Sequence, residues 1–174
     1  FINPRGEEKG KPTQIWTQGE TESNSAWMVT IDKPNQKTTQ ELAMTVPEKY
    51  VTLSNGLLVS QKKNTDGTRT DTWKLDLPHA PYLFFMGVGE YSVIKDSPYK
   101  GKEVSYYVEK EQAPYAKKVF GNTPEMMKFF SDLLGIDFPW PKYAQIVSRD
   151  YVSGAMENTT ATIHQESAYQ NSRE

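Results

Sequence analysis

The first half of the chain alternates apolar and polar residues in short runs, which predicts β-strands separated by turns. The alternation is clearest over 38–46, where Leu42, Met44 and Val46 fall on one face. Asn55-Gly56 is a strong turn signal between two such runs. This half is therefore expected to be a sheet-rich sandwich, and its predicted strands are 14–17, 38–46, 50–53, 57–61, 70–77 and 83–88, the last buried on both faces.

The second half mixes helix and strand signals. A helix is predicted with Thr123 as its N-cap, Pro124 at the first helical position and Gly135 at its end. Met126 and Met127 are expected in the core because of their helical spacing. The other elements predicted here are a short helix over 113–119 and strands over 104–108, 143–148 and 159–163.

A polar turn cluster over 96–101 indicates a domain boundary between these halves. We therefore predict an α+β chain with two domains, 1–98 and 99–174. The 174 residues are enough for one ordinary domain or two small ones, and the 36% hydrophobic fraction suits a sizeable core.

Composition excludes several classes of function. The net charge of −2 gives no basic surface for nucleic acid, and no apolar run approaches the roughly 20 residues of a membrane span. The chain has no cysteine, which excludes disulfides and thiolate metal sites. The absence of cysteine is compatible with a periplasmic or secreted protein, but the sequence does not show the compartment. Both ends of the chain look like cuts within a longer protein, since the chain starts at Phe1 and its first residues lack a signal-peptide core.

The sequence predicts no metal site and no catalytic residue in this segment. A catalytic zinc takes three protein ligands, often with the close spacing of a His-Glu-x-x-His helix. The two histidines, His79 and His164, have no such arrangement, and we expect them to be structural or surface residues. No Gly-x-Ser-x-Gly nucleophile motif or glycine-rich phosphate loop occurs either.

The run 154–158, Gly-Ala-Met-Glu-Asn, can carry a binding function. Gly154 allows another extended chain to lie close to the backbone, Glu157 adds a carboxylate and Asn158 can both donate and accept hydrogen bonds. Such a segment could add a peptide strand to a sheet and present a negative charge at the end of that peptide. The alternative is a surface strand with a solvated glutamate.

The same run is identical to the Gly-x-Met-Glu-Asn signature of zinc aminopeptidases of the aminopeptidase N type. Its setting resembles the family too, because 138–143 (Phe-Pro-Trp-Pro-Lys-Tyr) is similar to an aromatic-Pro-x-Pro-Lys stretch that lies upstream in those enzymes. The segment 17–20 resembles their Thr-Gln-x-Glu segment, and Ser54-Asn55-Gly56 and 80–83 resemble further stretches in the same order. The residues 24–30 depart from the family's Arg-x-x-Phe-Pro-Cys pattern.

The resemblance implies the later part of an N-terminal β-sandwich followed by the start of a thermolysin-like catalytic domain. It also implies a peptide substrate with a free N-terminus, whose ammonium group Glu20 and Glu157 would bind. Gln18 would line the pocket for the first side chain, and Gly154 and Ala155 would contact the substrate backbone. Asn158 would fix the loop that carries Glu157, and Met156 completes the predicted set: Gln18, Glu20, Gly154, Ala155, Met156, Glu157 and Asn158.

Zinc is the cofactor that the resemblance implies for the full-length protein, with ligands that this chain does not contain. In the family they follow the Gly-x-Met-Glu-Asn segment, so this segment alone is expected to be inactive. The alternative is a non-catalytic module that binds peptide N-termini. One branch of the family also opens epoxides of lipid-like substrates, and nothing in the sequence favours that activity here. A fragment of this kind is further expected to expose apolar surface and open strand edges.

Overall fold

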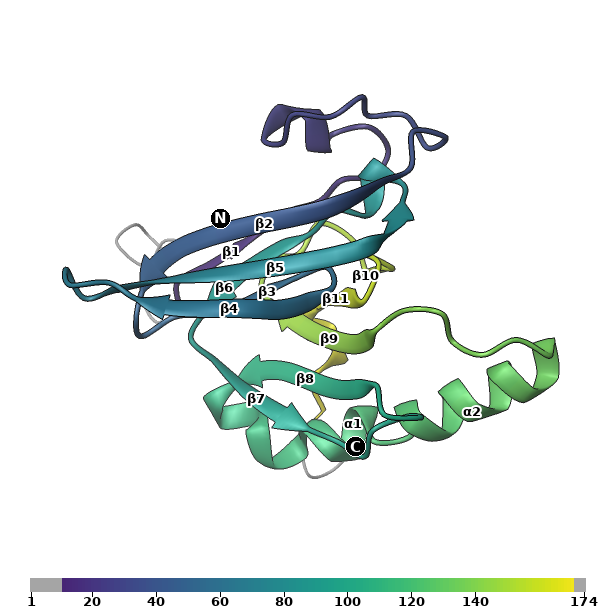
Figure 1. Ribbon diagram of the computed structural model, residues 1–174. Coiled ribbons are helices and arrows are strands. Elements are labelled where there is room, and N and C mark those ends of the chain that lie inside the picture. Colours follow the sequence, from purple (N-terminus) through teal and green to yellow (C-terminus); the bar gives the residue numbers. More distant parts are fainter. Residues whose placement is uncertain (1–10, 171–174) are drawn as a thin grey trace.

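The computed structural model describes residues 11–170, which form three β-sheets and two α-helices. In Figure 1 the α-helices lie at one end of the molecule. The two chain ends, which the sequence predicts to be cut points, lie outside this range. The α+β fold class predicted from the sequence is confirmed, with a β-rich first half followed by a mixed second half.

The first half contains two antiparallel three-stranded sheets. In one, β6 (Met86–Gly89) pairs with β1 (Gln14–Trp16) and with β3 (Val51–Ser54). In the other, β5 (Thr68–His79) lies between β2 (Thr38–Pro47) and β4 (Leu57–Lys63). The sequence predicted all six strands, with boundary differences of a few residues for most of them.

The second half is built on a five-stranded mixed sheet with the order β10-β11-β9-β8-β7. Strands β8 and β11 run parallel to the central β9, and the outer strands β7 and β10 are antiparallel to their neighbours. The bounds are β7 Tyr91–Lys95, β8 Glu103–Glu109, β9 Lys142–Ser148, β10 Ala155–Met156 and β11 Ala161–Gln165. The sequence analysis assigned no element to β7. The division after residue 98 falls in the connection between β7 and β8 and stays a prediction.

Two α-helices pack near this sheet, α1 (Ala116–Phe120) and α2 (Thr123–Leu134). Short 3₁₀ helices occur at Asn24–Ala26, Pro81–Leu83, Lys110–Tyr115 and Glu166–Ala168. None of the helices within residues 11–170 is long and apolar enough to cross a membrane.

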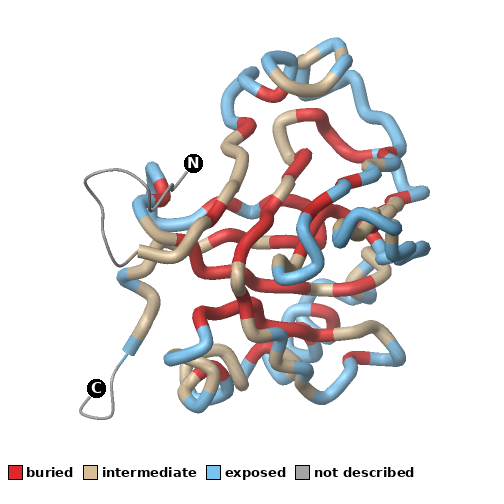
Figure 2. Tube along the Cα trace, turned by 90° about the vertical axis from the view of Figure 1, so that its left-hand side faces the viewer, coloured by how far each residue is buried: buried red, intermediate tan, exposed pale blue. Residues whose placement is uncertain are grey.

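One hydrophobic core joins both halves. Side chains of both three-stranded sheets, such as Leu53 and Trp73, pack in one cluster with Ile146 and Ile163 of the five-stranded sheet. A second cluster on the opposite face of that sheet includes Tyr106, and α1 and α2 contribute Ala116 and Met127 to it. Figure 2 shows the buried residues concentrated through the centre of the molecule. The relative position of the two halves is therefore set by close packing.

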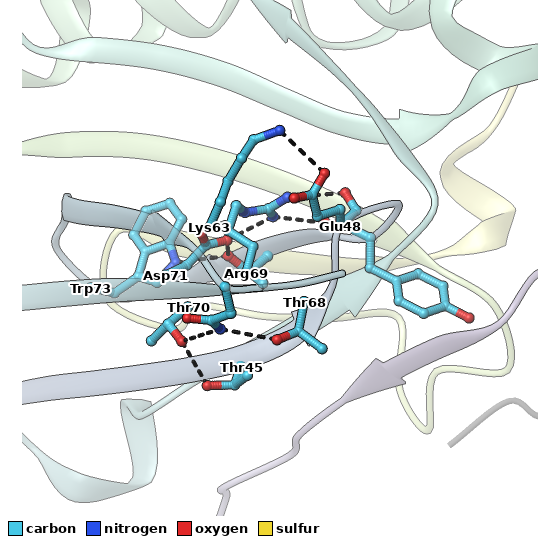
Figure 3. A network of polar contacts seen from close by, with 11 residues as sticks. Thr45, Glu48, Lys63, Thr68, Arg69, Thr70, Asp71 and Trp73 are labelled. Atoms are coloured by element: carbon cyan, nitrogen blue, oxygen red, sulfur yellow. Dashed lines mark hydrogen bonds and ion pairs between the residues drawn. The ribbon is translucent and has the colours of Figure 1, made fainter. Parts of the chain in front are cut away.

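A network of polar contacts around the buried Asp71 links the two sheets of the first half (Figure 3). The Asp71 carboxylate on β5 accepts hydrogen bonds from Arg69 at 2.7 and 2.8 Å and from Thr52 Oγ1 on β3 at 2.7 Å. The Thr52 hydroxyl in turn accepts a bond from Trp73 Nε1 at 3.0 Å. Burial opposes ionisation of Asp71, but these hydrogen bonds outweigh it and hold its pKa below the ordinary value.

The predicted strand over 83–88 is wrong in its first three residues. Pro81–Leu83 forms a 3₁₀ helix, and the strand begins only at Met86. Distant amide side chains bind the backbone carbonyls that a strand would use: Asn24 Nδ2 donates to Pro81 O and Phe84 O, and Asn55 Nδ2 donates to Leu83 O. These partners lie about 30 to 60 residues away in sequence, so local pattern could not predict this bend.

The expected burial of Met126 is wrong, whereas that of Met127 is confirmed. The buried residues of α2 are Thr123, Met127 and Ser131, spaced by four residues along one stripe. The rest of its apolar surface is solvent-exposed, at 54% to 69% for Met126, Phe129, Phe130, Leu133 and Leu134. A groove of about 390 Å³ lies between this face and the following segment. The expectation of exposed apolar surface is therefore met at α2.

The start of α2 also differs from prediction. Thr123 is the first helical residue and Asn122 precedes it, so Thr123 is not the N-cap. Its hydroxyl instead donates to Phe120 O at 2.6 Å and accepts from Gln145 Nε2 at 2.8 Å, which ties α1 and β9 to the helix. The predicted end is confirmed, since Gly135 adopts the left-handed conformation with φ 66°.

His79 is expected to make the protein acid-sensitive. Its ring is 2% exposed, packs against Phe84 at 4.9 Å, and neither ring nitrogen has a hydrogen-bond partner among the described residues. Burial lowers its pKa to about 4 from 6.5. Because the folded protein disfavours the protonated ring, the free energy of unfolding includes about 3 kcal/mol that is fully present above pH 6.5. This contribution is lost as the pH falls toward 4.

Replacing His79 by phenylalanine removes this titration and keeps a ring of similar size. The melting temperature of the full-length protein should fall between pH 7.5 and pH 4.5, and it should fall less in His79→Phe. Parallel pH curves for the two proteins would refute this assignment.

Candidate substrate-binding site

The structure brings together the two segments that the sequence analysis selected, 17–20 after β1 and 154–158 around β10. Gln18 Nε2 donates to the sulfur of Met156 at 3.6 Å, across 138 residues of sequence. Met156 is buried, whereas Glu20, Gly154, Ala155 and Glu157 are exposed. The exposed members are therefore accessible to a ligand, and Met156 and Gln18 link their two segments.

Tyr151 is a site residue that the sequence analysis missed. Its hydroxyl donates a hydrogen bond to Gln18 Oε1, and its ring packs edge-on against Trp16 with centroids 5.1 Å apart. Burial raises the pKa of Tyr151, and the negative charges of Glu157 and Glu20 raise it further. Both carboxylates thus lie close enough to act on the same phenol. Nothing in the local sequence distinguishes Tyr151 from a core aromatic residue.

Two exposed carboxylates from different halves of the chain, Glu20 and Glu157, therefore lie near enough to Tyr151 to raise its pKa. Like charges in such a place repel each other, and a bound cation relieves that repulsion. An ammonium group is a suitable cation because it can donate up to three hydrogen bonds. That Glu20 and Glu157 bind such a group stays a prediction.

Strand β10 forms the edge of its sheet beside these carboxylates. Its hydrogen-bonded neighbour within residues 11–170 is β11, and its other side is free. No described atom lies within 4 Å of the position that a Cβ of Gly154 would occupy. An extended chain could therefore approach this edge and pair with it, as in other complexes formed by strand addition.

Among residues 11–170, no hydrogen bond of the Asn158 side chain supports its predicted role in fixing the loop. Asn158 is 1% exposed, and neither atom of its side-chain amide has a hydrogen-bond partner in the described part of the chain. Its backbone carbonyl accepts a bond from Ala161 N at 2.9 Å, which closes the turn into β11. The side-chain role stays a prediction.

The described residues do not fit a zinc site. Among residues 11–170, no group of three or more His, Cys, Asp or Glu side chains could hold a metal ion. His79 packs against aromatic rings, and His164 Nε2 lies 3.0 Å from Gln145 Oε1. Burial lowers the pKa of both histidines. His79 is buried and His164 is half-buried, and their expected role as structural or surface residues stays a prediction.

Tyr151 is predicted to hold Gln18 in place. Replacing it by phenylalanine keeps the ring but removes the hydrogen bond to Gln18. The loss of this bond should cost about 1 kcal/mol, which lowers kcat/KM about fivefold for a substrate that contacts Gln18. The measurement is kcat/KM of the full-length protein on its substrate. Tyr91→Phe is the matched control, since it loses a buried bond to Ser148 at 2.9 Å outside this site. Equal losses in both variants would show that Tyr151 has no special role.

Comparison with known proteins identifies relatives for most of the chain. Residues 5–83 match the Peptidase M1 N-terminal domain, and residues 119–172 match the Peptidase family M1 domain. Human glutamyl aminopeptidase is 28% identical over 128 residues, which are 74% of this chain and 13% of that protein. Rat endoplasmic reticulum aminopeptidase 1 is 24% identical over 79% of this chain and 15% of its own length. Aminopeptidase M1 of Arabidopsis thaliana is 26% identical over 79% of this chain and 16% of its own length. The chain thus spans 13% to 16% of these relatives.

Proposed function

Because the chain belongs to peptidase family M1, we propose that the whole protein is a zinc-dependent aminopeptidase that removes N-terminal residues from peptides. The observation that carries the proposal is that the charges of Glu20 and Glu157 both act on Tyr151. Both carboxylates are exposed. Glu20 lies in the stretch that matches the Peptidase M1 N-terminal domain, and Glu157 lies in the stretch that matches the Peptidase family M1 domain.

In this proposal Glu20 and Glu157 bind the α-ammonium group of the substrate. An α-amino group has a pKa of about 7.7–8.0, so it is largely cationic at neutral pH. Each hydrogen bond between it and a carboxylate contributes about 1.5–3 kcal/mol. An acetylated or internal peptide has no such cation and would leave both carboxylates without a partner. The pair therefore selects substrates whose cleaved residue is the first one.

The remaining predicted residues position the substrate around this anchor. Gln18, held by Tyr151 and touching Met156, lines the pocket for the first side chain. Gly154 and Ala155 on the free edge of β10 contact the substrate backbone, and Asn158 belongs to the turn that carries Glu157. The division into domains 1–98 and 99–174 places Glu20 in one domain and Glu157 in the other.

Zinc would be held by residues outside the part of the chain described by the structure, since residues 11–170 offer no suitable set of ligands. We assign no step of the bond cleavage to these residues. The described segment by itself is therefore proposed to be inactive.

The experiment compares free and N-acetylated amino-acid anilides as substrates of the full-length protein with zinc. Zinc-dependent release of the aniline from the free-amine substrates alone would support the aminopeptidase. Equal cleavage of both kinds would contradict the amine anchor.

The second candidate is a non-catalytic module that binds peptide N-termini. In that case the full-length protein would bind free-amine peptides and would cleave neither substrate.

A further inference from the structure

A polar cluster joins the two halves of the chain next to the loop that carries Glu157. It consists of the turn Ser54–Gly56 between β3 and β4, Lys142 at the start of β9, and Thr159–Thr160 just before β11; we call it the inter-half cluster. Asn55 Nδ2 donates to Thr159 O at 2.7 Å, and Gly56 N donates to Thr160 Oγ1 at 2.8 Å. The first half therefore holds the end of this loop directly.

Lys142 lies at the centre of the inter-half cluster. Its ammonium nitrogen donates to Ser54 O at 2.8 Å, to Thr160 Oγ1 at 3.1 Å and to Thr160 O at 3.3 Å. It also lies 5.0 Å from the centroid of the Trp73 ring. Its three acceptors come from both halves, so one side chain connects the turn at 54–56 with Thr160.

Lys142 is deeply buried and has no carboxylate partner in the described part of the chain. Its exposed fraction is 3%, and burial lowers its pKa to about 7. A buried amine without an ion-pair partner is costly unless hydrogen bonds satisfy it. Here all the acceptors of Lys142 belong to the turn and to Thr160, so the same bonds that satisfy the amine also fix these two segments.

The loop that carries Glu157 is held at both of its ends. Before Glu157, Ala155 and Met156 pair with β11, and Gln165 N donates to Gly154 O at 3.0 Å. After it, Thr159 and Thr160 are held by the inter-half cluster, and Thr160 adopts an unusual positive φ of 67°. Non-glycine residues persist in this conformation only where surrounding contacts impose it.

Glu20 reaches the site from the first half, whereas Glu157 reaches it from the second. The separation of the two carboxylates therefore depends on how the 157–160 loop sits against the first half. We propose that Lys142 is a positioning residue of the substrate-binding site, which sets the place of Glu157 relative to Glu20 by holding Thr160 against the Ser54–Gly56 turn. This inference rests on the proposed function, because it assigns Lys142 a role in the amine anchor.

The experiment compares two ligands that differ only in the amine. The amide of a cleaved amino acid and its desamino counterpart are tested as competitive inhibitors of the full-length protein with zinc. Lys142→Met keeps the apolar stem but removes the amine. Thr160→Val removes one acceptor and keeps the branched side chain. Lys118→Met is the control, because Lys118 is an exposed lysine whose amine lies 5.8 Å from the centroid of the Tyr115 ring, outside the site.

We expect Lys142→Met to weaken inhibition by the amino-acid amide about tenfold, which corresponds to the loss of about one hydrogen bond to a charged group. Thr160→Val should weaken it in the same sense but less. The inhibition constant of the desamino compound should stay within about twofold of wild type in every variant. In Lys118→Met the inhibition constants of both ligands should stay within this range.

If Lys142→Met weakens inhibition by both ligands equally, or changes inhibition by neither, the proposed role of Lys142 is wrong. If Lys142→Met does not fold, Thr160→Val decides, and an unchanged ratio of the two inhibition constants in that variant refutes the inference. A wild-type protein that binds both ligands equally would instead refute the proposed amine anchor, and the role of Lys142 with it.

Discussion

Replacing Glu157 by glutamine is expected to lower kcat/KM for free-amine substrates by about tenfold to a hundredfold. The substitution keeps the size of the side chain and removes the charge that pairs with the ammonium group. A hydrogen bond between charged partners is worth about 1.5–3 kcal/mol, and each 1.4 kcal/mol corresponds to a factor of ten. Glu20→Gln should have an effect of similar size, because both carboxylates act on the same region next to Tyr151.

Glu22→Gln is the matched control for this prediction. Glu22 lies two residues from Glu20, is exposed and pairs with Lys33 at 2.7 Å. Such surface pairs contribute little to stability, so kcat/KM should change less than about twofold. A loss in Glu22→Gln as large as that in Glu157→Gln would mean that general negative charge, and not a specific anchor, attracts the substrate.

Gly56→Ala is expected to cause the largest loss of stability among the single substitutions considered. Gly56 has φ 78°, and a Cβ at this position would lie 1.9 Å from the backbone oxygen of Lys74. The backbone of the β3–β4 turn or of β5 would have to move. Because Gly56 N also donates to Thr160 Oγ1, the movement would disturb the inter-half cluster as well.

Gly67→Ala separates the cost of the positive φ from the cost of the steric contact with Lys74. Gly67 has almost the same φ of 80°, but no described atom lies within 4 Å of its would-be Cβ. Its substitution therefore reports the backbone cost alone, about 1–2 kcal/mol. The melting temperature of the full-length protein should fall by a few degrees in Gly67→Ala, and by at least twice as much in Gly56→Ala. Equal decreases would show that the contact with Lys74 is easily relieved.

The strands of the first half were predictable because their signals are local. Alternation over 38–46 and over 70–77 corresponds to β2 and β5, and Gly56 has the positive φ that the Asn55-Gly56 turn signal indicates. The bend at 81–85 was not predictable, because Asn24 and Asn55 impose it from far along the chain. The exposure of Met126 was missed for a related reason: helical spacing shows which residues share a face but not whether that face is covered.

The candidate site was predictable only in part. Gln18, Glu20 and the 154–158 run were identified by resemblance, and the structure brings the segments of Gln18 and Met156 into contact. Tyr151 gave no comparable signal, and Lys142 appeared only as part of the family-like stretch 138–143, without a role. A buried tyrosine and a buried lysine acquire their significance from partners more than 80 residues away, Gln18 and Ser54, which no local pattern connects to them.

The central claim is that carboxylates from two halves of the chain bind one substrate ammonium group. The most direct measurement is a structure of the full-length protein with a bound dipeptide that is not cleaved. We expect the α-amino nitrogen within about 3 Å of a carboxylate oxygen of Glu20 and of one of Glu157, the usual length of a charge-assisted hydrogen bond. A dipeptide whose amine pairs with neither carboxylate, or with groups from only one half, would contradict the account.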